Sequence, residues 1–332
     1  MFSKRTLQIP FLTLIFALSS QPIIADYSNH PDAQKVIDEL VAEEGLDRIK
    51  ITAVLAEAQK RQSIIDAISR PAEKTFTWGR YRNIFLKPDR IKNGAQFWRE
   101  NSIVLAKAET EFGVPAEIIV AIIGVETLYG GNTGSYPVID ALSTLAFDYP
   151  KRSAFFRSEL KHFLILTSQQ GQDPLQFKGS YAGAMGLGQF MPSSYRAYAK
   201  GYEEDGFIDI WTDTSDAIWS VANYLKAHKW EPGKEITRQL STGQEIPADL
   251  ISKDLEPHLS VVELRERGLK LGAVYEPYSE TTLMALDIDD RTEHWIGWHN
   301  FYVITRYNHS KLYAMAVYQL AEQIRETYES EL

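Results

Sequence analysis

The sequence predicts a mainly α-helical protein with a small β-region in its C-terminal third. Apolar residues recur at three- and four-residue spacing along most of the chain, which is the period of a helix with a buried face. After Trp230 the composition shifts toward Thr, Ser, Val and Pro. The helical period returns near the C-terminus. With 332 residues, 44% hydrophobic and 24% charged, the chain is long enough for two or three packed subdomains.

The first 25 residues predict a secretory signal peptide. Lys4 and Arg5 precede an apolar run at 11–18, and small or polar residues lead to Ala25, after which we expect cleavage. The run is too short to cross a bilayer. The segment contains two basic and no acidic residues, so its removal changes the formal net charge from −9 to −11. A buried N-terminal helix is the alternative, but the basic start favours export, and we expect a soluble periplasmic protein.

Helices are expected in succession along the mature chain, and proline or glycine marks several of their ends. Pro71 ends the first helical block, Gly113 stops the second, and Pro115 suits the first turn of the third, which ends at Gly130. The expected helical stretches cover about 32–70, 93–112, 115–129, 138–147, 153–170, 192–200, 214–228 and 306–331.

Strand-like stretches interrupt this helical pattern and predict a small β insertion. They lie at 236–237, 259–262 and 281–288. The domain organisation that we expect is a signal peptide at 1–25, an N-terminal helical subdomain at 26–112 joined by the C-terminal helix at 306–332, a core at 113–232, a small β subdomain at 233–290, and a return to the core at 291–332.

One carboxylate, Glu126, lies inside an otherwise apolar helical run at 118–128. Such a run predicts a helix that is buried on nearly all sides. Burial penalises the ionised carboxylate, so the pattern predicts a raised pKa and a proton donor near neutral pH, as a general acid requires. A glutamate that points to solvent, or one paired with an arginine for structural reasons, remains an alternative on this pattern alone.

Several other kinds of chemistry fit the sequence poorly. The absence of cysteine excludes disulfides, thiolate metal sites and a cysteine nucleophile, and the seven histidines form no zinc motif. The acidic chain has no dense Lys/Arg run, so we expect no nucleic-acid partner. The small residues at 183–188 lack the ending of a phosphate loop and instead indicate close backbone approach to another element or ligand. The 12% aromatic content suits a groove for sugar rings, although core packing explains many of these side chains.

An acidic stretch loosely fits a calcium loop. Glu203, Asp205 and Asp216 supply carboxylates, and Gly206 would allow the sharp turn. The spacing is poor, so a solvated acidic turn is the favoured interpretation and a structural calcium ion is kept as an option.

Three segments are specific enough to name a family. They are Gly124–Gly130, Tyr181–Tyr195 and Asn300–Ser310. Together they resemble the membrane-bound lytic murein transglycosylase B family, glycoside hydrolase family 103, and the similarity runs from about residue 30 to 325. The resemblance implies a lysozyme-like catalytic core at 113–232, beside the helical and β subdomains. It also implies no required cofactor, and peptidoglycan glycan strands and stem peptides as substrate. We further expect a monomer, with cell-wall synthases or divisome proteins as partners.

By that resemblance Glu126 is the single catalytic carboxylate. It would protonate the glycosidic oxygen between N-acetylmuramic acid (MurNAc) and N-acetylglucosamine (GlcNAc), then accept the proton of the muramoyl C6 hydroxyl as that oxygen attacks C1. The product is a 1,6-anhydro end, and no second carboxylate is needed, unlike in ordinary glycosidases. The substrate-binding residues implied are Ser180, Gln189, Phe190, Tyr81, Tyr224, Tyr307, Asn308 and Tyr313, with Lys151 and Arg152 for peptide carboxylates.

This chain departs from the family pattern at two places. Several relatives are lipoproteins, but no cysteine is present here to carry a lipid. Gly201 stands where the first acidic calcium ligand is expected. A muramidase that hydrolyses the same bond with water, and a non-catalytic glycan-binding protein of the cell wall, are the alternative functions.

Overall fold

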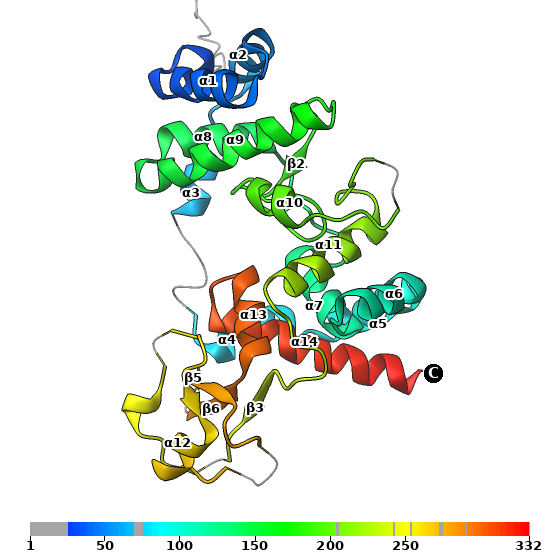
Figure 1. Ribbon diagram of the computed structural model, residues 1–332, viewed down its shortest axis with the longest axis vertical. Coiled ribbons are helices and arrows are strands. Elements are labelled where there is room, and N and C mark those ends of the chain that lie inside the picture. Colours follow the sequence, from blue (N-terminus) through cyan, green and yellow to red (C-terminus); the bar gives the residue numbers. More distant parts are fainter. Residues whose placement is uncertain are drawn as a thin grey trace, which may run out of the picture.

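The computed structural model describes residues 26–69, 76–203, 206–241, 243–252, 254–271, 275–289 and 291–331. The expected signal peptide, 1–25, therefore lies outside the described residues. Helices dominate the described part, and two small antiparallel sheets accompany them, which confirms the mainly α fold. The molecule is elongated: α1 (Pro31–Glu44) lies at one end and the larger sheet at the other (Figure 1).

The helices follow one another closely along the chain. In the first half they are η1 (Tyr27–Asn29), α2 (Arg48–Glu57), α3 (Gln62–Ile68), α4 (Trp78–Phe85), α5 (Pro88–Glu100), α6 (Ser102–Phe112), α7 (Ala116–Thr127), α8 (Val138–Asp148), η3 (Pro150–Arg152) and α9 (Ser153–Gln169). In the second half they are α10 (Pro192–Tyr198), α11 (Thr214–Ala227), η4 (Ala248–Leu250), α12 (Val261–Glu266), α13 (His299–Tyr307) and α14 (Lys311–Ser330).

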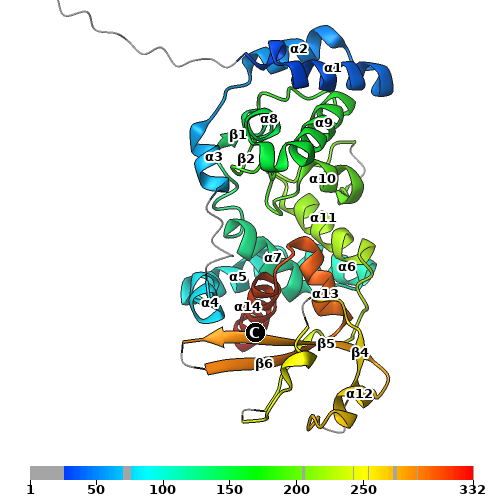
Figure 2. The same ribbon diagram turned by 90° about the vertical axis from the view of Figure 1, so that its left-hand side faces the viewer.

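The helices before residue 113 do not form the single N-terminal subdomain that the sequence predicted. Helices α1 to α3 pack on α8 and α9 at one end of the molecule (Figures 1 and 2). Arg61 pairs there with Asp140 at 2.8 Å. Helices α4 to α6 instead pack on α7 and α14. Gly94 of α5 is close enough to Ile324 of α14 that a Cβ would lie 2.6 Å from it. The expected unit at 26–112 is thus divided, because its two halves bury their apolar faces against different helices.

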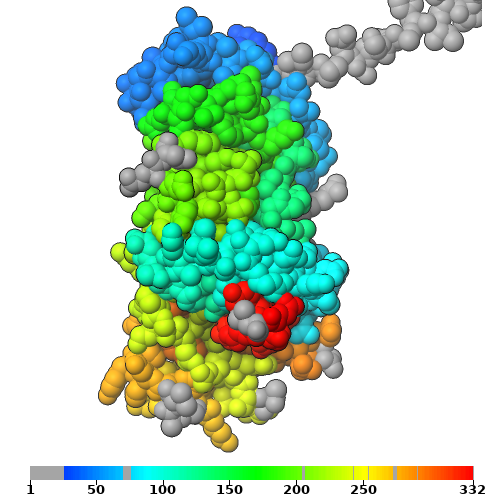
Figure 3. Space-filling view, turned by 90° about the vertical axis from the view of Figure 1, so that its right-hand side faces the viewer, coloured from blue at the N-terminus to red at the C-terminus, as the bar shows by residue number. Residues whose placement is uncertain are grey.

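The surface shows the same division. In Figure 3 the N-terminal helices cover one end of the molecule, and α5 and α6, coloured cyan, lie next to the red C-terminal helix α14.

Breaks in the helical pattern separate the neighbouring helices: Gly45 has φ 68° after α1, and Asn101 lies between α5 and α6. A glycine in the left-handed region is a common helix end, because it has no Cβ to clash.

The larger sheet is antiparallel and has the strand order β3-β6-β5-β4. Its strands are β3 (Thr237–Gln239), β4 (Leu259–Ser260), β5 (Glu280–Ile288) and β6 (Arg291–Gly297), and the smaller sheet pairs β1 (Tyr136–Pro137) with β2 (Lys178–Gly179). The β-region thus continues to Gly297, past the expected boundary at 290. The stretch at 259–262 was expected as a strand, but Val261 begins α12, because Ser260 and Glu263 form a capping box.

The chain ends in two helices where the sequence predicted one. Helix α13 stops at Tyr307, and Ser310 caps α14 by accepting a hydrogen bond from the Tyr313 backbone N–H at 3.4 Å. Helix α14 then runs between α4, α5, α7 and α13 (Figure 2). Its buried face therefore brings residues from the end of the chain to the C-terminal end of α7.

Candidate active site

The site is built on α7, whose apolar sequence makes it the most buried helix around Glu126. Nine of its twelve residues are buried, and Glu126 lies half-buried in the last turn. The helix ends at Leu128 and Tyr129, which both have positive φ (54° and 60°). Tyr129 folds back over Gly124, where a Cβ would lie 2.5 Å from its hydroxyl, and donates a hydrogen bond to the Arg90 carbonyl at 2.8 Å. Gly124 is therefore needed for this close approach.

Thr127 connects the end of α7 to the loop of small residues at 183–188. Its hydroxyl lies 2.9 Å from the Leu187 carbonyl oxygen, to which it donates, and it accepts a hydrogen bond from the Gly130 N–H at 3.1 Å. In the loop, a Cβ on Gly186 would lie 2.4 Å from the Ile210 carbonyl oxygen. The small residues thus serve close approach between parts of the same chain, one of the two interpretations that the sequence left open.

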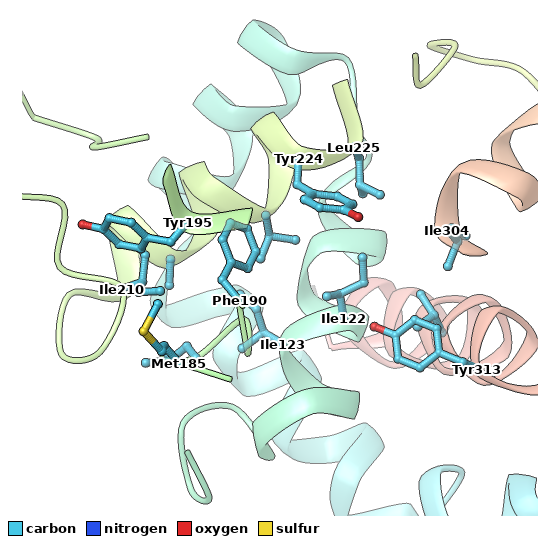
Figure 4. Packing of buried hydrophobic residues seen from close by; sticks show 14 of the residues in the cluster. Ile122, Ile123, Met185, Phe190, Tyr195, Ile210, Tyr224, Leu225, Ile304 and Tyr313 are labelled. Carbon is cyan, nitrogen blue, oxygen red and sulfur yellow. The ribbon is translucent and has the colours of Figure 1, made fainter. Parts of the chain in front are cut away.

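Tyr313 of α14 meets Glu126 directly. Its hydroxyl donates a hydrogen bond of 2.6 Å to Glu126 Oε1, and Figure 4 shows this hydroxyl directed toward α7. The Tyr307 ring lies parallel to the Tyr313 ring, at 6.4 Å between centroids. Burial, reinforced by the charge of Glu126, raises the pKa of both tyrosines well above the ordinary value. Both hydroxyls therefore stay protonated, and the Tyr313 hydroxyl remains a donor to the carboxylate.

Three aromatic rings form a wall next to Tyr313 and Glu126. Phe190, Tyr224 and Tyr307 lie with centroids 4.7 to 5.8 Å apart. The Tyr307 hydroxyl donates to the Gly188 carbonyl, and the Tyr224 hydroxyl to the Arg306 carbonyl, each at 2.5 Å. Phe190 is 2% and Tyr224 7% exposed. These two rings therefore pack inside the wall (Figure 4).

Ser180, Gln189 and Asn308 lie on the loops around the site. The Ser180 hydroxyl accepts a hydrogen bond from the Ala184 N–H at 3.1 Å. Gln189 has φ 51°, and its side-chain amide donates to the carbonyls of Thr133 and Gly186. Asn308 is half-buried in the turn between α13 and α14. The first two residues therefore stabilise the loops that follow β2 and α7.

The remaining expected residues fall in two places. Tyr81 of α4 is 3% exposed and lies near enough to Tyr313 to contribute to its raised pKa, after burial and Glu126. Lys151 and Arg152 are exposed in η3, after the end of α8, and the Arg152 guanidinium lies 4.4 Å from the centroid of the Phe155 ring. The structure thus brings Tyr81 to the Glu126 group and places the two basic residues in a separate part of the fold.

The match of the chain to a known protein family identifies the class of protein that carries this arrangement. The model of the transglycosylase SLT domain matches residues 28–322. The chain belongs to this family. Membrane-bound lytic murein transglycosylase B of Escherichia coli K12 is 41% identical over 308 residues, which are 90% of this chain and 84% of that protein. The resemblance drawn from the three sequence segments is confirmed, and the chain is an enzyme of the lytic transglycosylase class.

Solved structures support the same family and its lysozyme-like fold. Soluble lytic transglycosylase SltB1 from Pseudomonas aeruginosa is 48% identical with a TM-score of 0.84, over 90% of this chain and 99% of that one. The E. coli lytic transglycosylase Slt35, solved in complex with calcium, is 41% identical with a TM-score of 0.83, over 91% and 95%. P. aeruginosa SltB3, solved with NAG-anhNAM-pentapeptide and with NAG-NAM-pentapeptide, is 28% identical with a TM-score of 0.78, over 89% and 79%.

The acidic stretch that was kept as an optional calcium loop does not form a ligand set among the described residues. Asp216 is 5% exposed, and its two carboxylate oxygens accept the backbone N–H groups of Tyr202 and Asp209, each at 2.8 Å. Glu203 is exposed, and Asp205 lies outside the described residues. Within the described ranges, no three His, Asp or Glu residues are grouped to hold a metal. Asp216 thus stabilises the loop through backbone hydrogen bonds.

A cavity of about 700 Å³ lies apart from this site, and none of the expected site residues lines it. Its lining residues include Glu231, Tyr275, Trp298 and Tyr302.

Among the helices that the structure describes, we find none with the length and apolar character of a membrane span.

Thr127 and Tyr129 of the transglycosylase were missed by sequence reasoning. Both fix the turn that carries Glu126, through hydrogen bonds to Leu187 and Arg90. A glycine inside a buried helix is a signal that another group approaches it closely, so Gly124 could have pointed to Tyr129.

Proposed function

We propose that this transglycosylase cleaves the β-1,4 bond between MurNAc and GlcNAc in peptidoglycan, with Glu126 as its single general acid and base. The observation that carries the proposal is the hydrogen bond from Tyr313 to a half-buried Glu126, in a chain of this family. A fixed carboxyl group beside buried tyrosines suits proton transfer to a glycosidic oxygen. The complexes of SltB3 with NAG-anhNAM-pentapeptide and NAG-NAM-pentapeptide support the substrate and the anhydro product.

The proposed reaction is balanced within the substrate. Glu126 gives its proton to the glycosidic oxygen, which leaves as the GlcNAc hydroxyl when its bond to C1 breaks. The carboxylate then accepts the proton of the MurNAc C6 hydroxyl, whose oxygen bonds to C1 and closes the 1,6-anhydro ring. Glu126 ends protonated as it began, and no water is consumed, so no second carboxylate is required.

The surrounding residues are proposed to hold the strand. Tyr81, Tyr307, Tyr313 and Asn308 would line the groove, with Ser180 and Gln189 on the loops beside it. Phe190 and Tyr224 would support the wall from within, since both are buried. Lys151 and Arg152 would contact stem-peptide carboxylates. We further propose a monomeric enzyme that is exported to the periplasm by residues 1–25 and meets cell-wall synthases or divisome proteins there.

Mass spectrometry of the products released from purified sacculi tests the reaction. We expect the wild-type protein to release muropeptides lighter by one water than hydrolysed ones, and Glu126→Gln to lower the rate by about 10²-fold or more, because glutamine cannot transfer the proton. Hydrated MurNAc ends would make the protein a muramidase. Binding to sacculi without product release from either protein would make it a glycan-binding protein.

A further inference from the structure

A cationic surface lies on α4 and the start of α5, close to the candidate active site. Within residues 80–92 there are five basic side chains and one acid, Asp89. The basic residues of this α4–α5 cationic surface are Arg80, Arg82, Lys87, Arg90 and Lys92. The whole chain has a formal net charge of −9. A local positive surface on an acidic protein attracts an anionic ligand that the rest of the molecule would repel.

These charges are available to a ligand. Arg80, Lys87 and Lys92 are exposed, while Arg82 and Arg90 are half-buried. Within the described ranges none of the five forms an ion pair, whereas Lys161 on α9 pairs with both Glu39 and Glu43. Asp289, in the turn after β5, is an acidic group close to α4: its carboxylate lies 3.4 Å from where a Gly79 Cβ would be.

Aromatic rings hold two of the guanidinium groups. Arg80 lies 4.9 Å from the centroid of the Phe76 ring, and Arg90 lies 4.9 Å from that of Phe85. The Arg90 Nε and Nη1 atoms are enclosed and have no hydrogen-bond partner among the described residues. The exposed Arg80 guanidinium is therefore the one of the two that a carboxylate reaches most readily, and a guanidinium oriented by a ring loses little freedom when it binds a carboxylate.

Two connections place this surface beside Glu126. The Phe85 ring lies 5.0 Å from the Tyr81 ring, and Tyr81 lies near Tyr313, which donates to Glu126. Separately, the Arg90 carbonyl accepts the Tyr129 hydroxyl, three residues after Glu126. A glycan strand held at Glu126 would therefore bring its side groups close to α4 and α5.

On the basis of the proposed function, we propose that the α4–α5 cationic surface binds carboxylates of the stem peptides on the strand that occupies the active site. The glycan of peptidoglycan is itself uncharged apart from these peptides, so the peptides are the anionic groups that a basic surface can recognise. This contact is separate from Lys151 and Arg152, which lie in η3 after α8.

A binding measurement on the Glu126→Gln protein tests this proposal without requiring turnover. The test variant adds Lys87→Gln and Lys92→Gln, and the matched control adds Lys50→Gln and Lys270→Gln, which removes the same charge from exposed lysines on α2 and after α12. The probes are fluorescently labelled soluble glycan strands with their stem peptides, and the same strands after an amidase has removed the peptides and the lactyl carboxylates that this leaves on MurNAc have been converted to neutral methylamides. Binding is followed by fluorescence anisotropy at low ionic strength, where exposed charges are least screened.

We expect the test variant to bind the peptide-bearing strands about threefold to tenfold more weakly than the control variant, with equal binding of the peptide-free strands. Equal affinities of both variants for peptide-bearing strands would overturn the proposal. An equal loss on peptide-free strands, or no binding of peptide-bearing strands to the Glu126→Gln protein, would overturn it as well. The proposed reaction fails on a different result, the absence of anhydro products from wild-type digestion.

Discussion

At the residue scale, the site depends on one side chain that fixes another. Tyr313 is 2% exposed and donates to Glu126 Oε1 at 2.6 Å, so the carboxyl group cannot rotate freely. The raised pKa of Tyr313 keeps its proton in place across the pH range of an active enzyme. Orientation of the acid is thus supplied by a group that does not itself change protonation during the proposed reaction.

Tyr313→Phe removes this hydroxyl and leaves the ring packed against Tyr307. We expect kcat on soluble glycan strands to fall by about tenfold to hundredfold, because a hydrogen bond to a charged group contributes about 1.5–3 kcal/mol. Tyr195→Phe is the matched control: its hydroxyl is also buried and donates to the Ile208 carbonyl at 2.6 Å, away from Glu126. An unchanged kcat in Tyr313→Phe would remove Tyr313 from the positioning of the acid.

Glu126 and its partner differ in how far the sequence could predict them. The apolar run around Glu126 is a local pattern, and it indicated burial before any contact was known. Tyr313 lies 187 positions away, and its contact arises only when α14 packs on α7. Its place in the site came from resemblance, because no local spacing links two residues so far apart.

At the element scale, the end of α7 is held by its connection to the loop at 183–188. Thr127 is 1% exposed and joins the Leu187 carbonyl to the Gly130 N–H.

This connection also explains why the ends of helices were harder to predict from the sequence than the helices themselves. The ranges of α8, α9 and α11 follow from local periodicity, but the left-handed residues after α7 depend on contacts with a distant loop.

Thr127→Val is nearly isosteric and removes this connection. We expect it to lower the free energy of unfolding by about 1–3 kcal/mol, since it leaves buried backbone groups without a partner, and to lower kcat because the Glu126 turn loosens. Thr167→Val is the control. Thr167 is equally buried, but its hydroxyl donates to carbonyls within α9 itself. Urea unfolding and kcat of both variants check the expectation, which fails if the two behave alike.

At the scale of the whole molecule, buried tyrosines recur in both parts of the fold. Tyr27 lies with α1 and α8 at one end, Tyr195 on α10, and Tyr224 near the site, where Tyr129 is half-buried. Periodicity predicts that a helix has a buried face but not which helix covers it, so the arrangement of the two helical groups could not be predicted from the sequence.

The buried tyrosines give the whole molecule one measurable property, the dependence of its stability on alkaline pH.

Titration of these tyrosines is expected to lower the free energy of unfolding at alkaline pH. Burial raises the pKa of Tyr195 and of Tyr224 to about 12, and it raises the pKa of Tyr27 and Tyr129 further. Between the ordinary value of about 10 and the folded value, the folded state keeps protons that the unfolded state releases. The stabilising contribution is therefore complete below pH 10 and is lost as the pH rises toward 12.

We expect urea unfolding midpoints to fall steeply once the pH exceeds about 10. Tyr195→Phe should flatten part of this fall, because one buried phenol no longer titrates, whereas Tyr278→Phe should leave the slope unchanged, since Tyr278 is 85% exposed. The comparison is made between slopes, so a constant loss of stability from the missing hydroxyl does not affect it. Identical slopes for the wild type and Tyr195→Phe would show that burial of this phenol does not govern the alkaline transition.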